Sequence, residues 1–244
     1  MWTAFDAVIL VASVSAGAIA SVAGFGIGSL LTPIFALQAG AKTAVAAVSV
    51  AHLAGTAIRC WALRAHIDGT VLWRFGLASA VGGLSGALLN ASVSSPALAL
   101  VLGAILVFAG VSQVTGLSAR WRFHGPFIWL AGVASGFFGG LVGNQGGIRS
   151  AAMLGLDLSK EQFVATATAI ALCVDATRMP VYIVAERQQV AAIWPLVLIA
   201  TLGVVAGTIV GGRVMARVPE WRFRQVVGVL VALLGIVMLV RAHA

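Results

Sequence analysis

Long apolar runs divide this sequence, and they restrict the fold more than any other feature. A helix that spans a bilayer needs about 20 mainly apolar residues. Because 61% of the 244 residues are apolar and only 9% are charged, a water-soluble fold could not cover this apolar surface. We therefore expect an all-α polytopic membrane protein with about eight full transmembrane helices. The runs lie near residues 5–23, 43–62, 71–90, 97–116, 126–143, 162–182, 191–211 and 225–241.

Two shorter apolar runs, near residues 26–39 and 147–156, each follow a glycine-rich break. The first break reads GFGIG at residues 24–28, and the second reads GGLVGNQGG at residues 139–147. Glycine allows the backbone to leave helical geometry, and such backbone persists at membrane depth only against protein or a water-filled cavity. The sequence thus predicts two short broken or half-spanning helices, and it leaves open whether they cross the membrane fully.

Three pairs of residues recur at nearly one spacing along the chain. Their recurrence predicts two related transmembrane repeats, residues 1–118 and 119–244, each with a long helix, a glycine break, a short helix and three long helices. Glycine-interrupted segments at matching positions of two halves indicate the binding site of a transporter. The pairs are Lys42 and Lys160, 118 residues apart, Arg59 and Arg178, 119 apart, and Gly24 and Gly143, 119 apart.

The loops differ in charge, and this difference predicts how the chain crosses the membrane. Segments 59–74, 118–125 and 213–224 are rich in arginine, whereas 90–96 and 183–190 carry no net charge. The positive-inside rule places the basic segments in the cytoplasm and the neutral ones outside. All five segments obey this rule only if both short runs cross the membrane. Each half then crosses five times, an odd number, so the second half is inverted relative to the first. We expect a multi-pass protein of the cell inner (plasma) membrane.

The second break carries polar residues that favour an anion site. Gly146 and Gly147 open a short helix whose free N–H groups and positive dipole end attract anions. Asn144 and Gln145 can donate hydrogen bonds, and Arg149 adds a guanidinium group that matches an oxyanion. We interpret these five residues as substrate-binding. The alternative is close helix packing through glycine, with Arg149 facing a lipid headgroup.

The helix predicted at residues 162–182 carries a second polar group. Asp175 and Arg178 are three residues apart, so they share one helix face. They form either an intrahelical ion pair that lowers the cost of both charges or a substrate site in which Asp175 orients Arg178 or carries a proton. Thr166 and Thr168 are also candidate substrate ligands, although threonine often joins helices by hydrogen bonds.

The first break offers glycines without polar neighbours, and one histidine follows it. Gly24, Gly26 and Gly28 could bring a helix end toward the same cavity as the second break, so we count them as candidate substrate contacts. His52, in the helix predicted at 43–62, is a candidate proton-coupling residue. A lone histidine on an apolar helix can instead be a hydrogen-bonded packing residue.

Other classes of function find little support in the sequence. It contains no HExxH, GxSxG or P-loop motif, so we expect neither an enzyme nor a cofactor or metal. The net charge of +8 does not indicate nucleic-acid binding, because the 15 basic residues lie mostly in short breaks between apolar runs. The predicted partners are a small anionic substrate and the lipid bilayer, and the sequence leaves a homodimer open.

The duplicated glycine break and the helix start that follows it resemble the TauE/SafE sulfite exporter family, also called the DUF81 permeases. The resemblance covers nearly the whole chain and rests on residues 24–33 with 40–49, and on 136–147 with 160–170. It implies a transporter of sulfite, sulfoacetate or another small sulfur oxyanion or organic acid. The chain departs from the family's nearly pure glycine run in the second half, because its second break is polar.

These observations together predict a secondary transporter or facilitative carrier that exports a small anion such as sulfite or an organosulfonate. An inside-negative potential favours the outward movement of an anion by about 2.3 kcal/mol per charge per 100 mV, so export needs no coupled ion. The alternatives are an anion channel, a proton-coupled importer of a small organic acid, or a structural membrane subunit. The sequence does not identify the substrate.

Overall fold

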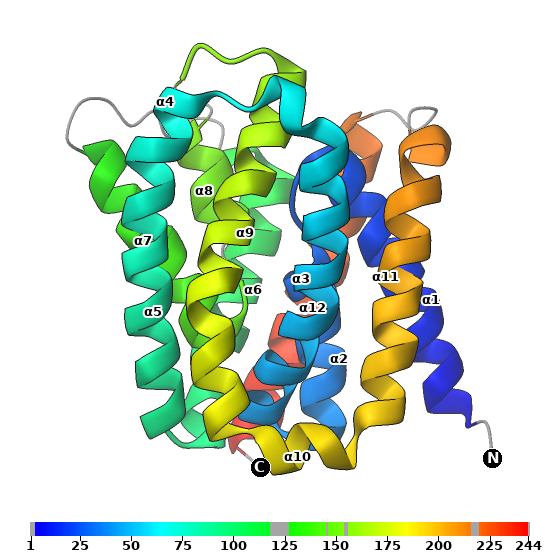
Figure 1. Cartoon of the computed structure of the whole chain (residues 1–244). Coiled ribbons are helices and arrows are strands. Elements are labelled where there is room, and N and C mark those ends of the chain that lie inside the picture. The colour runs from blue at the N-terminus through cyan, green and yellow to red at the C-terminus, as the bar shows by residue number, and fades with distance from the viewer. Residues whose placement is uncertain (1–2, 118–126, 145, 154–155, 216–219, 244) are drawn as a thin grey trace.

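The computed structural model describes residues 3–117, 127–144, 146–153, 156–215 and 220–243, and their regular secondary structure is entirely helical. Most helices run along one common direction, with their turns gathered at two ends of the bundle (Figure 1). Six helices within the described residues are long and apolar enough to cross a membrane, and all six coincide with predicted spans. The all-helical membrane fold is therefore confirmed, whereas the number of eight full spans is not.

The first half starts at a capping box in which Thr3 accepts from the Asp6 N–H and the Asp6 carboxylate accepts from the Thr3 N–H. Its long third helix, α3, runs through the middle of the bundle (Figure 1). The elements are α1 (Ala4–Ala23), α2 (Ile27–Ala39), α3 (Ala41–Leu63), the 3-10 turn η1 (Arg64–His66), α4 (Gly69–Val71), the π-helical turn η2 (Leu72–Gly76), α5 (Leu77–Ser92) and α6 (Ser95–Thr115).

The second half follows the same order with a shorter second helix. A capping box between Ser159 and Gln162 fixes the start of its long third helix, α9. The elements are α7 (Phe127–Val142), α8 (Gly146–Met153), α9 (Lys160–Ala185), α10 (Arg187–Ala192), α11 (Trp194–Met215) and α12 (Glu220–His243). The run near 126–143 thus forms a helix of 16 residues, which is short for a full span.

Both predicted breaks occur, and one local device produces them. Gly24 ends α1 with φ +76° and donates its N–H to the Ala20 carbonyl at 3.0 Å. Gly143 follows α7 with φ +74° and donates to the Gly139 carbonyl at 3.1 Å. The left-handed backbone conformation just past a helix end costs free energy for any residue that has a Cβ atom. The glycines therefore set where each broken helix stops.

The helices pair across the two halves. α1 packs mainly on α11, α7 on α5, and α6 on α12, while α3 and α9 cross at the centre. Glycine makes these approaches close, because a Cβ atom at Gly17 would collide with the Val204 carbonyl, and one at Gly86 would collide with the Phe137 carbonyl. Small residues at helix interfaces are typical of membrane proteins, in which van der Waals packing rather than water exclusion joins helices.

The two ends of the bundle hold different turns. η1 and α4 lie at one end, together with the ends of α6 and α11 and the starts of α7 and α12 (Figure 1). α10 lies at the other end, with the start of α1 and the end of α12. The described helix ends that border the segments predicted to be cytoplasmic therefore lie at one end, and the neutral segment 183–190 lies at the opposite end.

Candidate functional site

The seam between α3 and α9 is joined by a buried charged cluster. The Nδ1 atom of His52 lies 2.7 Å from Oδ2 of Asp175. Arg178 donates from Nε to Oδ1 of Asp175 at 3.0 Å, and its Nη2 atom lies 2.7 Å from the same oxygen. All three side chains are buried. The intrahelical ion pair that the spacing of Asp175 and Arg178 allows is thus present, and both of its side chains are buried inside the bundle.

Arg178 also binds the end of the broken helix α7. Its Nη1 atom donates to the Gly139 carbonyl at 2.6 Å, and the Tyr182 hydroxyl donates to the neighbouring Gly140 carbonyl. The guanidinium carbon lies 5.9 Å from the centroid of the Tyr182 ring. Carbonyl groups in the last turn of a helix carry negative partial charge, and Arg178 adds a second donor to the Gly139 carbonyl, which also accepts from the Gly143 N–H. Arg178 and Tyr182 therefore stabilise the point where α7 breaks.

Arg149, on α8, reaches the opposite break. Its Nη2 atom donates to the Gly24 carbonyl at 3.2 Å, at the end of α1. Only 1% of the surface of Arg149 is exposed, and its Nε and Nη1 atoms have no hydrogen-bond partner within the described residues. A buried guanidinium group with unused donors is costly unless an anion or water satisfies it. Arg149 is therefore placed to bind a further acceptor.

The two breaks are in direct contact. The Ser29 hydroxyl donates to the side-chain Oδ1 atom of Asn144 at 3.2 Å, while the Nδ2 atom of the same side chain has no partner within the described residues. A Cβ atom at Gly28 would collide with the Gly143 carbonyl oxygen. The glycines therefore serve close packing, as the alternative interpretation expected, and they also bring a polar side chain of one half against a polar side chain of the other.

A small cavity lies where the breaks meet. Its volume of about 10 Å³ suits about one water molecule, so a larger anion would require side chains to move. Two unsatisfied donor groups, on Arg149 and Asn144, belong to residues of its wall. The lining residues are Phe25, Gly26, Gly28, Ser29, His52, Gly143, Asn144, Gly146 and Arg149.

Arg59 belongs to the same cluster, although the sequence analysis assigned it no binding role. It is buried on α3 and donates from Nε to the Thr168 hydroxyl at 2.9 Å, and its Nη1 atom has no partner within the described residues. It lies about two helical turns after His52 on α3, so the two side chains share one face of that helix. The signal that could have identified it was its spacing of 119 residues from Arg178.

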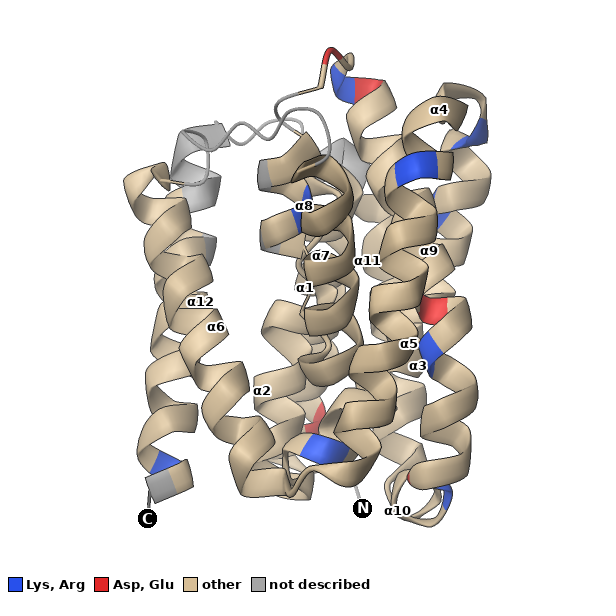
Figure 2. Cartoon of the chain, turned by 90° about the vertical axis from the view of Figure 1, so that its left-hand side faces the viewer, with Lys and Arg blue, Asp and Glu red and all other residues tan. Residues whose placement is uncertain are grey.

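The cluster carries an excess of positive charge. Arg59, Arg149 and Arg178 contribute three positive charges and Asp175 contributes one negative charge, so with neutral His52 the surplus is two. Figure 2 shows charged residues within the bundle, between its two ends. Uncompensated buried charge is unfavourable in a medium of low dielectric constant, and an anion would remove that cost.

The structure brings most of the predicted site residues together. Gly24 accepts from Arg149, and Thr168 accepts from Arg59. Thr166 is the exception, because its hydroxyl accepts from the Asp68 N–H at 2.9 Å, in the turn that leads to α4, and it does not line the cavity. Gly147 lies in the first turn of α8. Gln145 lies outside the described residues.

A model of the family described as "Sulfite exporter TauE/SafE" matches residues 9–238, which is almost the whole chain. The chain belongs to the TauE/SafE family. Together with the apolar helices, this membership makes the protein an integral membrane protein of a transporter family and confirms the expected resemblance. No curated protein and no solved structure matches the chain. Membership of the TauE/SafE family therefore gives the class of function, and the substrate and its binding residues have to be inferred from the site.

Proposed function

We propose that the protein is a secondary transporter or facilitative carrier that exports a small anion, such as sulfite or an organosulfonate, across the inner membrane. The single observation that carries this proposal is the surplus of two buried positive charges beside the cavity where two broken helices meet. Guanidinium groups present several N–H donors that match the oxygens of sulfite or a sulfonate. Membership of the TauE/SafE family supports the same class of substrate.

The pairing of helices supports an inverted repeat. α1 and α7 start at opposite ends of the bundle (Figure 1). Each of them packs on the third long helix of the other half, α1 on α11 and α7 on α5, and α3 meets α11 as α9 meets α5. In this proposal the two halves rock against each other about the central site, which is how many transporters with inverted repeats alternate access.

The unsatisfied donors define the proposed binding residues. Arg149 and Arg59 supply the free guanidinium donors, and Asn144 adds an amide donor. Gln145 remains a predicted ligand from its position in the sequence. Arg178 contributes charge from a fixed position, since its donors are already used by Asp175 and the Gly139 carbonyl.

Closed contacts at both ends of the α3–α9 seam favour a carrier over an open channel. At one end the Thr43 hydroxyl donates to Oε2 of Glu186 at 2.9 Å, and at the other the Asp68 N–H donates to the Thr166 hydroxyl at 2.9 Å. Each contact joins one half to the other. An opening of the seam at either end would have to break one of these contacts, as expected for a carrier that changes between two states.

A proton-coupled importer of a small organic acid is the second candidate, and the contact between His52 and Asp175 favours it. A histidine hydrogen-bonded to a carboxylate can exchange a proton in the physiological range, and uptake of an anion against an inside-negative potential needs a coupled cation. In this version Asp175 and His52 carry the proton beside the bound anion. Export needs no such coupling, so the pH dependence of flux separates the two candidates.

The test is transport by the purified protein in liposomes. We expect efflux of radiolabelled sulfite to saturate and to show counterflow, both of which a channel lacks. Arg149→Ala should abolish flux and the thermal stabilisation by sulfite, while expression stays normal because the change removes an unpaired buried charge. Absence of binding and flux for sulfite and organosulfonates in the wild-type protein, or unchanged stabilisation in Arg149→Ala, would overturn the proposal.

A further inference from the structure

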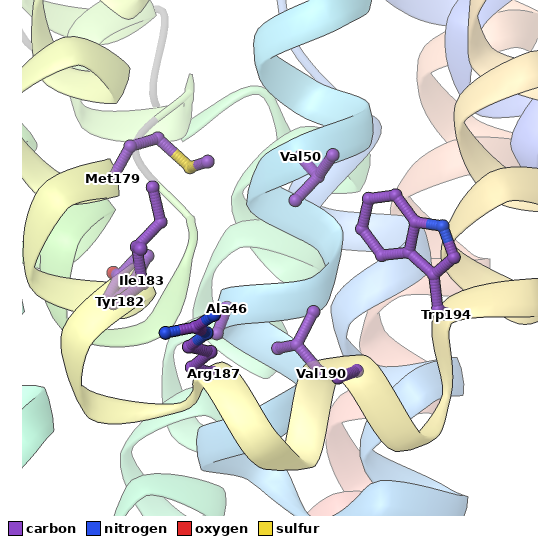
Figure 3. A pocket seen from close by; sticks show the side chains of 9 residues that line it. Ala46, Val50, Met179, Tyr182, Ile183, Arg187, Val190 and Trp194 are labelled. Atoms are coloured by element: carbon purple, nitrogen blue, oxygen red, sulfur yellow. The ribbon is translucent and has the colours of Figure 1, made fainter.

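A second and much larger cavity lies toward the α10 end of the same α3–α9 seam. It has a volume of about 600 Å³ and lies between α3, α9, α10 and the start of α11 (Figure 3). Its walls are almost wholly apolar, apart from one arginine. The lining residues are Ala46, Val50, Met179, Tyr182, Ile183, Arg187, Val190, Ala191 and Trp194.

The arginine of this cavity has no counter-charge. Arg187 is the first residue of α10, and Figure 3 shows its side chain among the residues of the cavity wall. Within the described residues it makes no ion pair. The adjacent Glu186 carboxylate accepts from Thr43 instead. The exposed guanidinium group of Arg187 thus lies beside an apolar wall without an ion-pair partner.

The cavity adjoins the central charged cluster. The Ser49 hydroxyl donates to the Met179 sulfur at 3.0 Å, and this contact closes the seam between the cavity and the next pair along it, His52 and Asp175. Tyr182 lines the cavity and also lies against the Arg178 guanidinium. A methionine and a tyrosine of this wall therefore lie next to residues of the central cluster.

We propose that this cavity is a second anion site, and that its ligand is a soluble organic anion with an apolar group, such as an aryl- or alkylsulfonate. The acid group would pair with Arg187, and the apolar group would pack on Val50, Val190 and Trp194. Burial of the apolar group in this cavity is favourable, whereas a bare inorganic anion would lose hydration against an apolar wall without compensation. Charge and shape therefore select an amphipathic ligand.

A transported ligand would then occupy the two sites one after the other. This order of occupation rests on the proposed function, whereas binding to the cavity does not depend on transport. A phospholipid shares the ligand's chemistry, since it also combines an anionic group with an apolar chain. We commit to the soluble anion because the cavity shares Tyr182 with the central cluster, and this position suits a ligand that passes between the two sites.

Calorimetry of the purified protein with benzenesulfonate and with sulfite tests the inference. We expect Arg187→Gln to weaken benzenesulfonate about tenfold, the effect of one charge-assisted hydrogen bond, and to leave sulfite unchanged. Arg149→Ala should do the reverse. A wild-type protein that binds benzenesulfonate but not sulfite would count against the proposed function. Equal affinities of the wild-type protein and Arg187→Gln for benzenesulfonate would overturn this inference.

A matched pair of variants guards against effects on folding. Ala191 and Ala192 are neighbouring exposed residues of α10, and only Ala191 lines the cavity. Ala191→Phe should fill part of the cavity and weaken benzenesulfonate, while Ala192→Phe should not. Mass spectrometry of the same preparations decides between ligands, because a phospholipid retained by the wild type, lost from Arg187→Gln and displaced by no sulfonate would contradict a soluble ligand.

Discussion

The two broken helices share a backbone device but not a chemistry. Gly24 and Gly143 both end a helix in the left-handed conformation. Counting 119 residues from the first break to the second, Phe25 corresponds to Asn144, and Leu30 corresponds to Arg149. The first break thus contributes the Gly24 carbonyl, close packing and the Ser29 hydroxyl, whereas the second contributes the Arg149 and Asn144 donors that have no partner within the described residues. Duplication can therefore supply a symmetric scaffold while only one of the two breaks carries unused donors.

The same asymmetry separates the two central arginines. Arg59 and Arg178 are 119 residues apart, and at the same spacing Thr56 corresponds to Asp175. Arg178 is neutralised by Asp175, whereas Arg59, within the part of the chain that the structure describes, donates to a threonine hydroxyl and keeps an unused donor. One arginine thus holds the break in place, and the other is available to a ligand. Removal of each side chain should therefore have opposite consequences.

The largest effect is expected for Arg178→Met. The change leaves Asp175 buried beside His52 without its cation, and the loss of one partner from a buried pair costs about 3–5 kcal/mol. Thermal unfolding in detergent should show a marked fall in melting temperature with or without sulfite. The double variant Arg178→Met with Asp175→Asn should recover much of that loss; a double variant as unstable as the single one would show that the ion pair is not the reason.

A smaller and different effect is expected for Arg59→Met. No carboxylate pairs directly with Arg59, so its removal should leave the melting temperature of the anion-free protein unchanged or slightly raised. Sulfite affinity should fall by about 1.5–3 kcal/mol, the contribution of a hydrogen bond to a charged group. Calorimetry measures it, with Arg64→Met as the control, because Arg64 is exposed at the end of α3. Equal loss in both variants would refute a specific role for Arg59.

Local features of this site could be predicted from the sequence, and features that depend on helix crossing could not. The breaks follow from glycine, and the pair of Asp175 and Arg178 follows from a spacing of three residues on one helix. The roles of Arg59 and Thr166 depend on how α3 and the turn before α4 lie against α9, which no local pattern determines. Both threonines were candidate ligands, although residues two apart on a helix do not share a face, and the fold directs Thr168 to Arg59 and Thr166 to a turn.

The smallest effect compares the two breaks themselves through Gly24→Ala and Gly143→Ala. A residue with a Cβ atom pays about 1–2 kcal/mol in the left-handed conformation, so both variants should melt at lower temperature. The new methyl group at Gly24 would meet its nearest atom at 3.7 Å, an ordinary contact, whereas at Gly143 it would lie 3.2 Å from the Thr32 hydroxyl. Gly143→Ala should therefore be the less stable of the two. Adding Thr32→Ala to both variants should bring their melting temperatures closer together, since it removes the crowded atom at one break only. A difference in melting temperature that persists unchanged would instead locate the extra cost in the polar residues of the second break.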